Sequence, residues 1–259
     1  MRLVILGSGT SFGVPVIGCD CAVCQSDDPR DRRTRVAAVI EGSNANRVLI
    51  DTPPELRLQL VDAGIPSVDA VLYTHDHADH VHGIDDLRAI SIRRTENLPV
   101  YGPPDSLDRI KERFSYIFDA DAAPRTGTSV PKLSLEALKP GIAVSVAGIE
   151  VTPIEVSHGY GMIVYGYRFG EIAYLTDAKE IPREGIEALM GVRRLVVNGL
   201  FKRSHPTHLS ISEACDLAAT VGAEKTYLTN LTHETGHEEL LDSLPDGVEP
   251  AFDGLIIEL

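Results

Sequence analysis

Thr74-His75-Asp76-His77-Ala78-Asp79-His80 follows directly on the apolar run 71–73 and holds four potential metal ligands. The apolar run predicts a buried strand, so these ligands are expected at a strand end. Neutral imidazole and carboxylate groups bind hydrolytic divalent metals at physiological pH. Alternation directs His75 and His77 to one side, while Asp79 and His80 can turn toward a second ion. The segment therefore predicts a metal site.

Short apolar runs bounded by Gly, Pro, Asn and Asp recur along the chain and predict a protein rich in strands. Strands are expected at 3–6, 47–50, 70–73, 144–146, 151–156, 164–169, 172–175, 195–198, 226–229 and 255–257. Helices are expected at 54–63, 106–116 and 211–221, with Ser210 as N-cap of the last, and a surface excursion at 119–132. Because no linker divides the chain, residues 1–259 are predicted to form one α/β domain of two stacked sheets with helices outside.

The chain is acidic, with 38 acidic against 24 basic residues and a formal net charge of −14. A field of this sign repels nucleic-acid phosphates, so duplex nucleic acid is not an expected partner. Four arginines lie beside or among Asp27, Asp28 and Asp31 and are expected to form a solvated, self-paired surface: Arg30, Arg32, Arg33 and Arg35. No apolar stretch is long enough to span a membrane, and residues 1–7 resemble a buried strand, so we expect a cytoplasmic protein without a membrane partner.

The pattern His-x-His-x-Asp-His after a strand resembles the signature of the metallo-β-lactamase superfamily, whose fold is a four-layer αβ/βα sandwich of two mixed sheets. The resemblance implies that three histidines hold one divalent metal, zinc or manganese, and that an aspartate and a histidine hold a second. It also implies an aspartate bridging both ions. The first set is His75, His77 and His158, the second is Asp79 and His80, and the bridge is Asp177. Two ions roughly 3.5–4 Å apart can hold a hydroxide nucleophile and clamp a phosphoryl oxygen.

One ligand position departs from the family pattern. The predicted strand 226–229 is followed by Asn230, where the family commonly has histidine. An amide oxygen is a weaker ligand for a borderline metal, so the second ion is expected to be held less firmly. His233 and His237 lie close enough in the sequence for one of them to compensate.

Cys19-Asp20-Cys21-Ala22-Val23-Cys24 forms a C-x-C-x2-C motif. Three thiolates suit a tetrahedral soft-metal site that takes one more ligand from elsewhere. Together with Gly-Ser-Gly-Thr-Ser-x-Gly-Val-Pro at 7–15, the motif is similar to the PhnP-like branch of the superfamily, the phosphoribosyl cyclic phosphodiesterases. This resemblance implies a structural zinc in an insertion around 17–26, closed by a late histidine that corresponds to His233.

His205-Pro206-Thr207-His208 precedes a predicted helix. A histidine at this place can protonate an alkoxide leaving group when a phosphodiester is cleaved. By resemblance, one histidine of the segment occupies the general-acid position, and we favour His205 over His208. Asp79 is expected to orient the nucleophilic water as well as to bind metal.

These features predict a metal-dependent phosphodiesterase for a small cyclic or nucleotide-like phosphodiester, with two active-site metals and one structural zinc. An RNase Z-like tRNA 3′ endonuclease is an alternative, although the acidic charge and the cysteine motif count against it. Lactone or thioester hydrolysis would leave His205 with little to protonate. Asn230 leaves open a catalytically weak, metal-dependent nucleotide-binding protein as another alternative. A homodimer is also compatible with the sequence.

Overall fold

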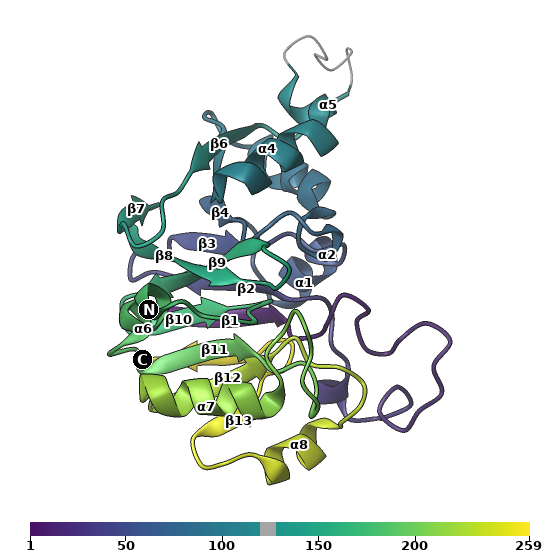
Figure 1. Ribbon diagram of the computed structural model, residues 1–259. Coiled ribbons are helices and arrows are strands. Elements are labelled where there is room, and N and C mark those ends of the chain that lie inside the picture. The colour runs from purple at the N-terminus through teal and green to yellow at the C-terminus, as the bar shows by residue number, and fades with distance from the viewer. Residues whose placement is uncertain (120–127) are drawn as a thin grey trace.

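Two seven-stranded sheets lie face to face in the computed structural model, which describes residues 1–119 and 128–259 (Figure 1). The first sheet is mixed: the strands from β14 to β3 pair antiparallel, and those from β3 to β6 pair parallel. In sheet order its strands are β14 (Ile256–Glu258), β1 (Arg2–Gly7), β2 (Ala37–Glu41), β3 (Arg47–Ile50), β4 (Ala70–Leu72), β5 (Leu98–Gly102) and β6 (Leu133–Ala137).

The second sheet is mixed in the same way. Its strands pair antiparallel from β7 to β10 and parallel from β10 to β13. In sheet order they are β13 (Val248–Pro250), β12 (Lys225–Thr229), β11 (Arg194–Asn198), β10 (Ile172–Leu175), β9 (Ile163–Phe169), β8 (Ile149–Ser157) and β7 (Val144–Val146).

Helices cover the outer faces of both sheets. The helices are α1 (Leu56–Asp62), α2 (Ala78–Val81), α3 (Arg88–Ser91), α4 (Pro104–Arg113), α5 (Ser115–Phe118), α6 (Arg183–Leu189), α7 (Ile211–Val221) and α8 (His237–Ser243), with 3-10 turns η1 (Pro29–Asp31) and η2 (Ile84–Leu87). No helix among the described residues is both long and apolar enough to cross a membrane.

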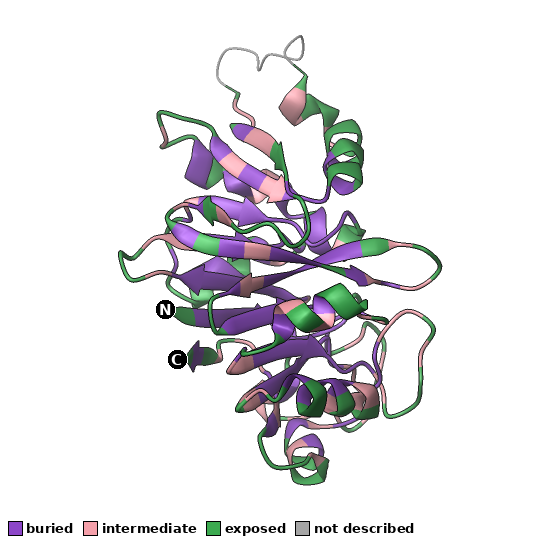
Figure 2. Cartoon of the chain, turned by 60° about the vertical axis from the view of Figure 1, so that its left-hand side comes forward, coloured by how far each residue is buried: buried purple, intermediate pink, exposed green. Residues whose placement is uncertain are grey.

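Apolar side chains on both faces of the central strands explain the layering. In β1, Leu3 and Ile5 face the core between the sheets, whereas Val4 and Leu6 pack toward the outer helices. This follows from the two-residue period of a strand. Figure 2 shows the strands buried and the exposed surface concentrated on helices and loops. The four-layer sandwich predicted from the sequence is confirmed.

The ends of parallel strands place the functional segments at one edge. Strands β3, β4, β10 and β12 each end in a loop that carries a polar residue, and neighbouring parallel strands end on the same side of a sheet. Strand β8 pairs antiparallel with β9, which pairs antiparallel with β10, so β8 ends on that side too. Five loops from the two sheets can therefore meet at this edge.

Every strand expected from the sequence is present, with ends that move by no more than two residues, and α7 has the predicted bounds. Ser210 caps α7: its Oγ accepts from the backbone N–H of Glu213, whose carboxylate accepts from Ser210 N. The expected helix 106–116 is interrupted at Phe114, which separates α4 from α5. Strands β2, β5, β6 and β13 escaped prediction. Of these, β5 and β13 each contain a proline, which weakens a strand signal. Of the predicted excursion 119–132, residues 120–127 lie outside the described residues.

Candidate metal centre

Three histidines meet at the shared edge of the sheets. His75 lies in the loop after β4, His77 is the N-cap of α2, and His158 follows β8. Their ligand nitrogens all lie within 4.8 Å of one another. Nε2 of His75 is buried and has no hydrogen-bond partner among the described residues, which is unusual unless the atom coordinates a cation. The structure thus brings together the three side chains that the sequence assigned to one metal.

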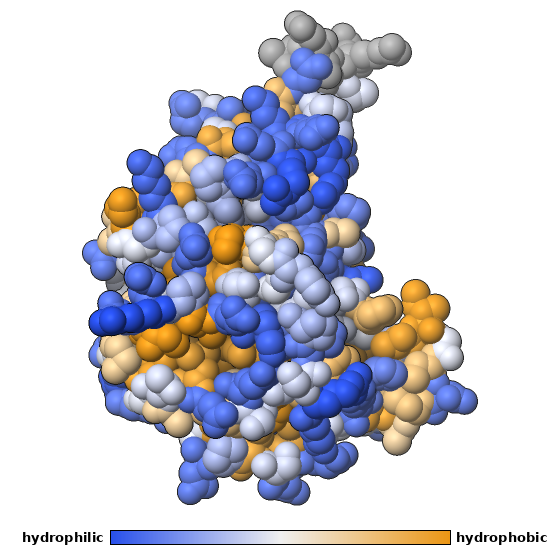
Figure 3. Space-filling view, viewed as in Figure 1, coloured by the Kyte–Doolittle hydropathy of each residue, from blue (hydrophilic) through white to orange (hydrophobic). Residues whose placement is uncertain are grey.

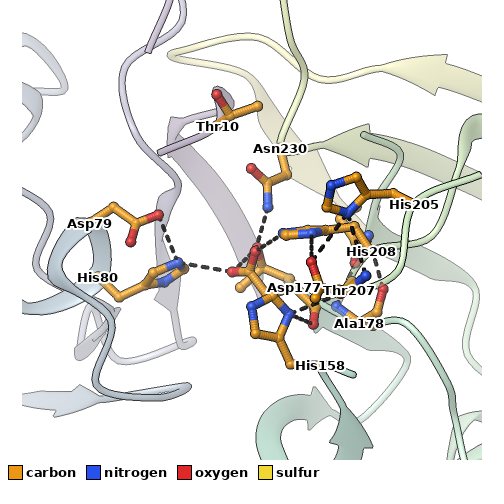
Figure 4. A network of polar contacts seen from close by, with 12 residues as sticks. Thr10, Asp79, His80, His158, Asp177, Ala178, His205, Thr207, His208 and Asn230 are labelled. Carbon is orange, nitrogen blue, oxygen red and sulfur yellow. Dashed lines mark hydrogen bonds and ion pairs between the residues drawn. The ribbon is translucent and has the colours of Figure 1, made fainter. Parts of the chain in front are cut away.

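Asp177 occupies the middle of the cluster, two residues after β10 and with a left-handed backbone (φ 54°). His80 Nε2 lies 2.9 Å from its Oδ2 and 3.4 Å from Oδ2 of Asp79 (Figure 4). The potential metal-binding groups that share Asp177 are His75–His80–Asp177 and His158–Asp177–His208. A carboxylate common to both groups has the position that a ligand bridging two cations requires.

Asp51 supports this cluster from behind and was not identified in the sequence. It directly follows β3, is fully buried and has a left-handed backbone (φ 62°). Its carboxylate accepts from Thr74 N and from Thr74 Oγ1, both at 2.8 Å, and from His80 Nδ1 at 2.8 Å. These contacts turn the Nε2 atom of His80 toward Asp177. The sequence pattern that identified the His-rich loop could also have identified Asp51, because both directly follow an apolar run that predicts a strand.

Burial and charge separate the pKa values within the cluster. Burial holds the pKa of His75 well below its ordinary value, and the neighbouring His80 adds to the effect. Burial also disfavours charged His80, but Asp177 and Asp51 outweigh it and raise the pKa of His80 well above its usual range. Burial opposes ionisation of Asp177, yet His80 and His208 hold its pKa far below the ordinary value. His75 is therefore neutral. His80 is protonated on both ring nitrogens, and a cation that binds its Nε2 atom must displace the proton there.

The structure separates the two histidines of the His205–His208 segment. His208 Nε2 donates to Asp177 Oδ1 at 2.6 Å, and its Nδ1 lies 2.8 Å from Thr207 Oγ1. The ring of His205 packs against the ring of His208, with 5.3 Å between the two centroids. Both line one cavity, but only His208 contacts the central carboxylate. Geometry therefore favours His208, although the sequence led us to favour His205.

Asn230 also faces Asp177. It directly follows β12, is buried, and has a left-handed backbone (φ 59°). Its side-chain Nδ2 donates to Asp177 Oδ1 at 2.7 Å. The amide nitrogen, rather than the oxygen that a metal would need, thus points into the cluster. His233 and His237 do not compensate, since neither belongs to the groups around Asp177.

The three cysteines and His233 form a second, separate cluster. The Sγ atoms of Cys19, Cys21 and Cys24 lie 3.3, 3.4 and 3.5 Å from Nδ1 of His233. None of the cysteines is in a disulfide. The backbone N–H of Cys24 donates to Cys21 Sγ, and this is the largest of the effects that lower the pKa of Cys21 to about 6. The four donors have the composition of a structural zinc site.

Arg33 corrects the expectation of a solvated arginine surface. It is only 1% exposed and donates to the carbonyl groups of Thr232 and Thr235, on either side of His233. Its Nη2 also lies 3.0 Å from Asp31 Oδ1, and Asp31 accepts from His237 N at 2.7 Å. A buried guanidinium is stable only when paired and hydrogen-bonded, as here. The pair therefore fixes the loop that supplies His233.

Two cavities adjoin the histidine cluster. One of about 310 Å³ is lined by residues of the cluster, by Phe12 and by Phe201. Another of about 560 Å³ shares His77 with it and is lined by Asp76 and by Arg109 of α4. Arg109 and Arg113 both pair with Asp76, so they are held by a carboxylate of the His-rich loop. Both volumes fall in the range of small-molecule sites.

Comparison with known proteins gives consistent matches. A model described as the Beta-lactamase superfamily domain matches residues 46–230. The crystal structure of a diphosphatase from the PhnP family superposes with a TM-score of 0.90 and 39% identity, covering 100% of this chain and 97% of the other. An octanoyltransferase of Porphyromonas gingivalis is 43% identical over 98% of this chain, but the chain spans only about half, 51%, of that protein. A ribonuclease Z of Myxococcus xanthus is 25% identical, with 84% of this chain and 90% of the relative covered.

Proposed function

Because this chain belongs to the metallo-β-lactamase superfamily, in its PhnP-like branch, we propose that it is a metal-dependent hydrolase of a small cyclic or nucleotide-like phosphodiester. The observation that carries the proposal is the convergence on Asp177. One oxygen of this carboxylate lies 2.9 Å from His80, and the other accepts from His208 and Asn230. A buried carboxylate surrounded by histidines at a strand-end cavity is a suitable centre for hydrolysis.

The donor set fits two divalent cations. We assign one to His75, His77 and His158, since the Nδ1 atom of His158 donates to the backbone oxygen of Asp177 at 2.7 Å and leaves Nε2 free for a cation. We assign the other to Asp79 and His80, with Asp177 between the two. When bound, such ions lower the pKa of water and stabilise charge on phosphoryl oxygens. The cysteine cluster with His233 would hold a structural zinc.

The protein's own groups have separate roles in this proposal. His208 is the candidate proton donor for the leaving alkoxide, because it lines the cavity and is oriented by Asp177. His205 lines the same cavity without contacting Asp177 and is left to contact substrate. Asn230 positions Asp177 through its amide nitrogen, and it would have to turn over to act as the weak ligand that the sequence suggested. Asp79 faces the cavity and can orient water.

The more specific parts of the prediction stay proposals. A cytoplasmic location and a homodimer are expectations from the sequence. The ribonuclease Z relative favours tRNA 3′ processing as a second candidate, because the match covers most of both proteins. The octanoyltransferase relative, of which the chain spans half, brings acyl-thioester hydrolysis back into consideration. A nucleotide-binding protein without turnover is the remaining alternative.

One set of assays separates these activities. We expect the purified protein to contain about three metal ions per chain and to cleave bis(p-nitrophenyl) phosphate when supplied with Mn²⁺. Octanoyl-CoA and a precursor tRNA with a 3′ extension are tested beside it. Faster cleavage of either competing substrate would reassign the enzyme. A protein that binds nucleotide but leaves every substrate intact would contradict hydrolysis altogether.

A further inference from the structure

Phe12 is an exposed aromatic residue in the wall of the catalytic cavity. Its side chain is 73% exposed, yet it lines the same cavity as His77, Asp79 and Asp177. Figure 3 shows apolar surface on the segment that projects from the molecule after β1. Aromatic side chains are typical of the walls of ligand sites, and the ring of Phe12 is open to contact from the cavity. No ring of the described residues stacks on it.

The backbone holds Phe12 in a fixed position. Gly13 N donates to Thr10 O at 2.9 Å, and Phe12 N to Thr10 Oγ1 at 3.2 Å, so residues 10–13 form a tight turn. Gly13 has a left-handed φ of 66°, which glycine adopts without strain. Arg35 Nε donates to the carbonyl group of Ser11 at 2.7 Å and ties the turn to the strand region before β2. The ring is therefore presented by an ordered turn.

The rest of the cavity wall combines a second ring with polar groups. Phe201 lines the cavity, and the guanidinium of Arg203 covers it at 3.9 Å from the ring centroid. Thr10 and Thr232 also line the cavity and carry hydroxyl groups that can donate or accept. An acyl chain would gain nothing from such hydroxyl groups. A flat, heteroatom-rich ring matches both the aromatic and the polar parts of the wall.

We infer that Phe12 is a stacking platform for a nucleobase, so that the substrate is a phosphodiester of a nucleoside and not of a bare sugar. This rests on the proposed function and narrows its substrate class. The base lies against Phe12 while the phosphodiester lies at the cluster around Asp177. Stacking tolerates any base, because every base has a π face, and it is selective only against substrates that lack one.

Two substrates that differ only in the base test the inference. These are adenosine 2′,3′-cyclic phosphate and methyl riboside 2,3-cyclic phosphate, in which a methoxy group replaces the base. We expect Phe12→Ala to lower the ratio of kcat/KM for the first over the second by on the order of tenfold. Phe12→Trp should keep the ratio. Ile17→Ala is the matched control, because Ile17 is 98% exposed on the same segment and does not line the cavity.

A binding measurement separates this inference from the proposed activity. Calorimetry compares AMP with ribose 5-phosphate on the wild-type protein and on Phe12→Ala. Weaker binding of AMP alone supports the stacking platform even if no phosphodiester is cleaved. An equal effect of Phe12→Ala on both members of each pair, or no effect on either, overturns the platform. Failure to cleave any phosphodiester, with AMP preference intact, counts only against the hydrolase.

Discussion

The histidine cluster and the cysteine cluster are both groups of metal-binding side chains, but they are built in opposite ways. The histidine cluster lies at the ends of strands from both sheets, with His75, His80 and His158 buried, and Asp51 orients part of it. The cysteine cluster lies on a segment that projects from the sheets (Figure 1), with Cys19 and Cys21 partly exposed. The first site is therefore formed by the fold, whereas the second holds its own segment in place.

This difference predicts opposite consequences for ligand loss. A ligand on a scaffold that is already packed can be removed with little effect on folding. Removing a ligand from a segment with few apolar contacts takes away much of what orders it, since structural zinc sites contribute folding free energy directly. Activity and stability should thus respond separately to the two clusters.

The largest expected effect is loss of activity in His77→Ala. His77 is exposed and belongs to the group with His75 and His158, so its loss removes a ligand without leaving a core cavity. We expect hydrolysis of bis(p-nitrophenyl) phosphate to fall to background while the melting temperature changes by less than about 2 °C. Retained activity would exclude this group as the catalytic centre.

Next in size is the contrast between His208→Ala and His205→Ala. We expect His208→Ala to lower kcat by about 10²–10⁴ on a substrate with an alkoxide leaving group, and His205→Ala to have a much smaller effect. The loss in His208→Ala should shrink with p-nitrophenolate, which leaves without help from an acid. Metal content is measured in both variants. The reverse order would restore the preference for His205 that came from the sequence.

Asp51→Asn tests whether the fold orients the histidine cluster. Asparagine keeps the shape but cannot accept from His80 Nδ1 and Thr74 as an ionised carboxylate does. We expect a loss of about 10–100-fold in Mn²⁺ affinity or in kcat/KM. Asp242→Asn, on the exposed surface of α8, is the control. Equal Mn²⁺ affinity and equal kcat/KM in the two variants would mean that the cluster needs no support from Asp51.

Cys21→Ser should act on stability first. We expect the protein to lose one zinc ion and to melt at least about 5 °C lower, with part of its activity retained. Cys215→Ser provides a matched control, because Cys215 lies on α7, outside the cluster. An unchanged zinc content and melting temperature would refute the structural zinc, and with it the contrast between the two clusters.

The smallest effect concerns the pH dependence of metal loading. The pKa of His80 is raised, so in the metal-free protein its ion pairs with Asp177 and Asp51 stabilise the fold at low pH and are lost as the pH rises through that pKa. A cation must displace this proton, so affinity at His80 should rise as the pH approaches the raised pKa of His80. The lowered pKa of His75 means that its ring has no such proton to lose when a cation binds. Calorimetric titrations that gave parallel pH dependence for both ions would count against this assignment.

Local patterns in the sequence were enough to predict much of the molecule. Patterns of residues close together in the chain identified four kinds of feature. These are the strands with alternating or continuous apolar residues, the helix that Ser210 caps, the His-rich loop and the cysteine motif. The pairing of the cysteines with His233, more than 200 residues away, came only from resemblance to a family. Spacing alone contains no information on such a contact.

The sequence by itself determined which chemical groups are present and that several stand at strand ends, because apolar periodicity and ligand type are local properties. Tertiary structure alone decided how they are used. It turned the amide nitrogen of Asn230 toward Asp177 and placed His208, and not His205, in contact with Asp177. It also buried Arg33 beside the loop that carries His233. These outcomes depend on left-handed backbone positions and on contacts between distant segments, which form only when both sheets pack together.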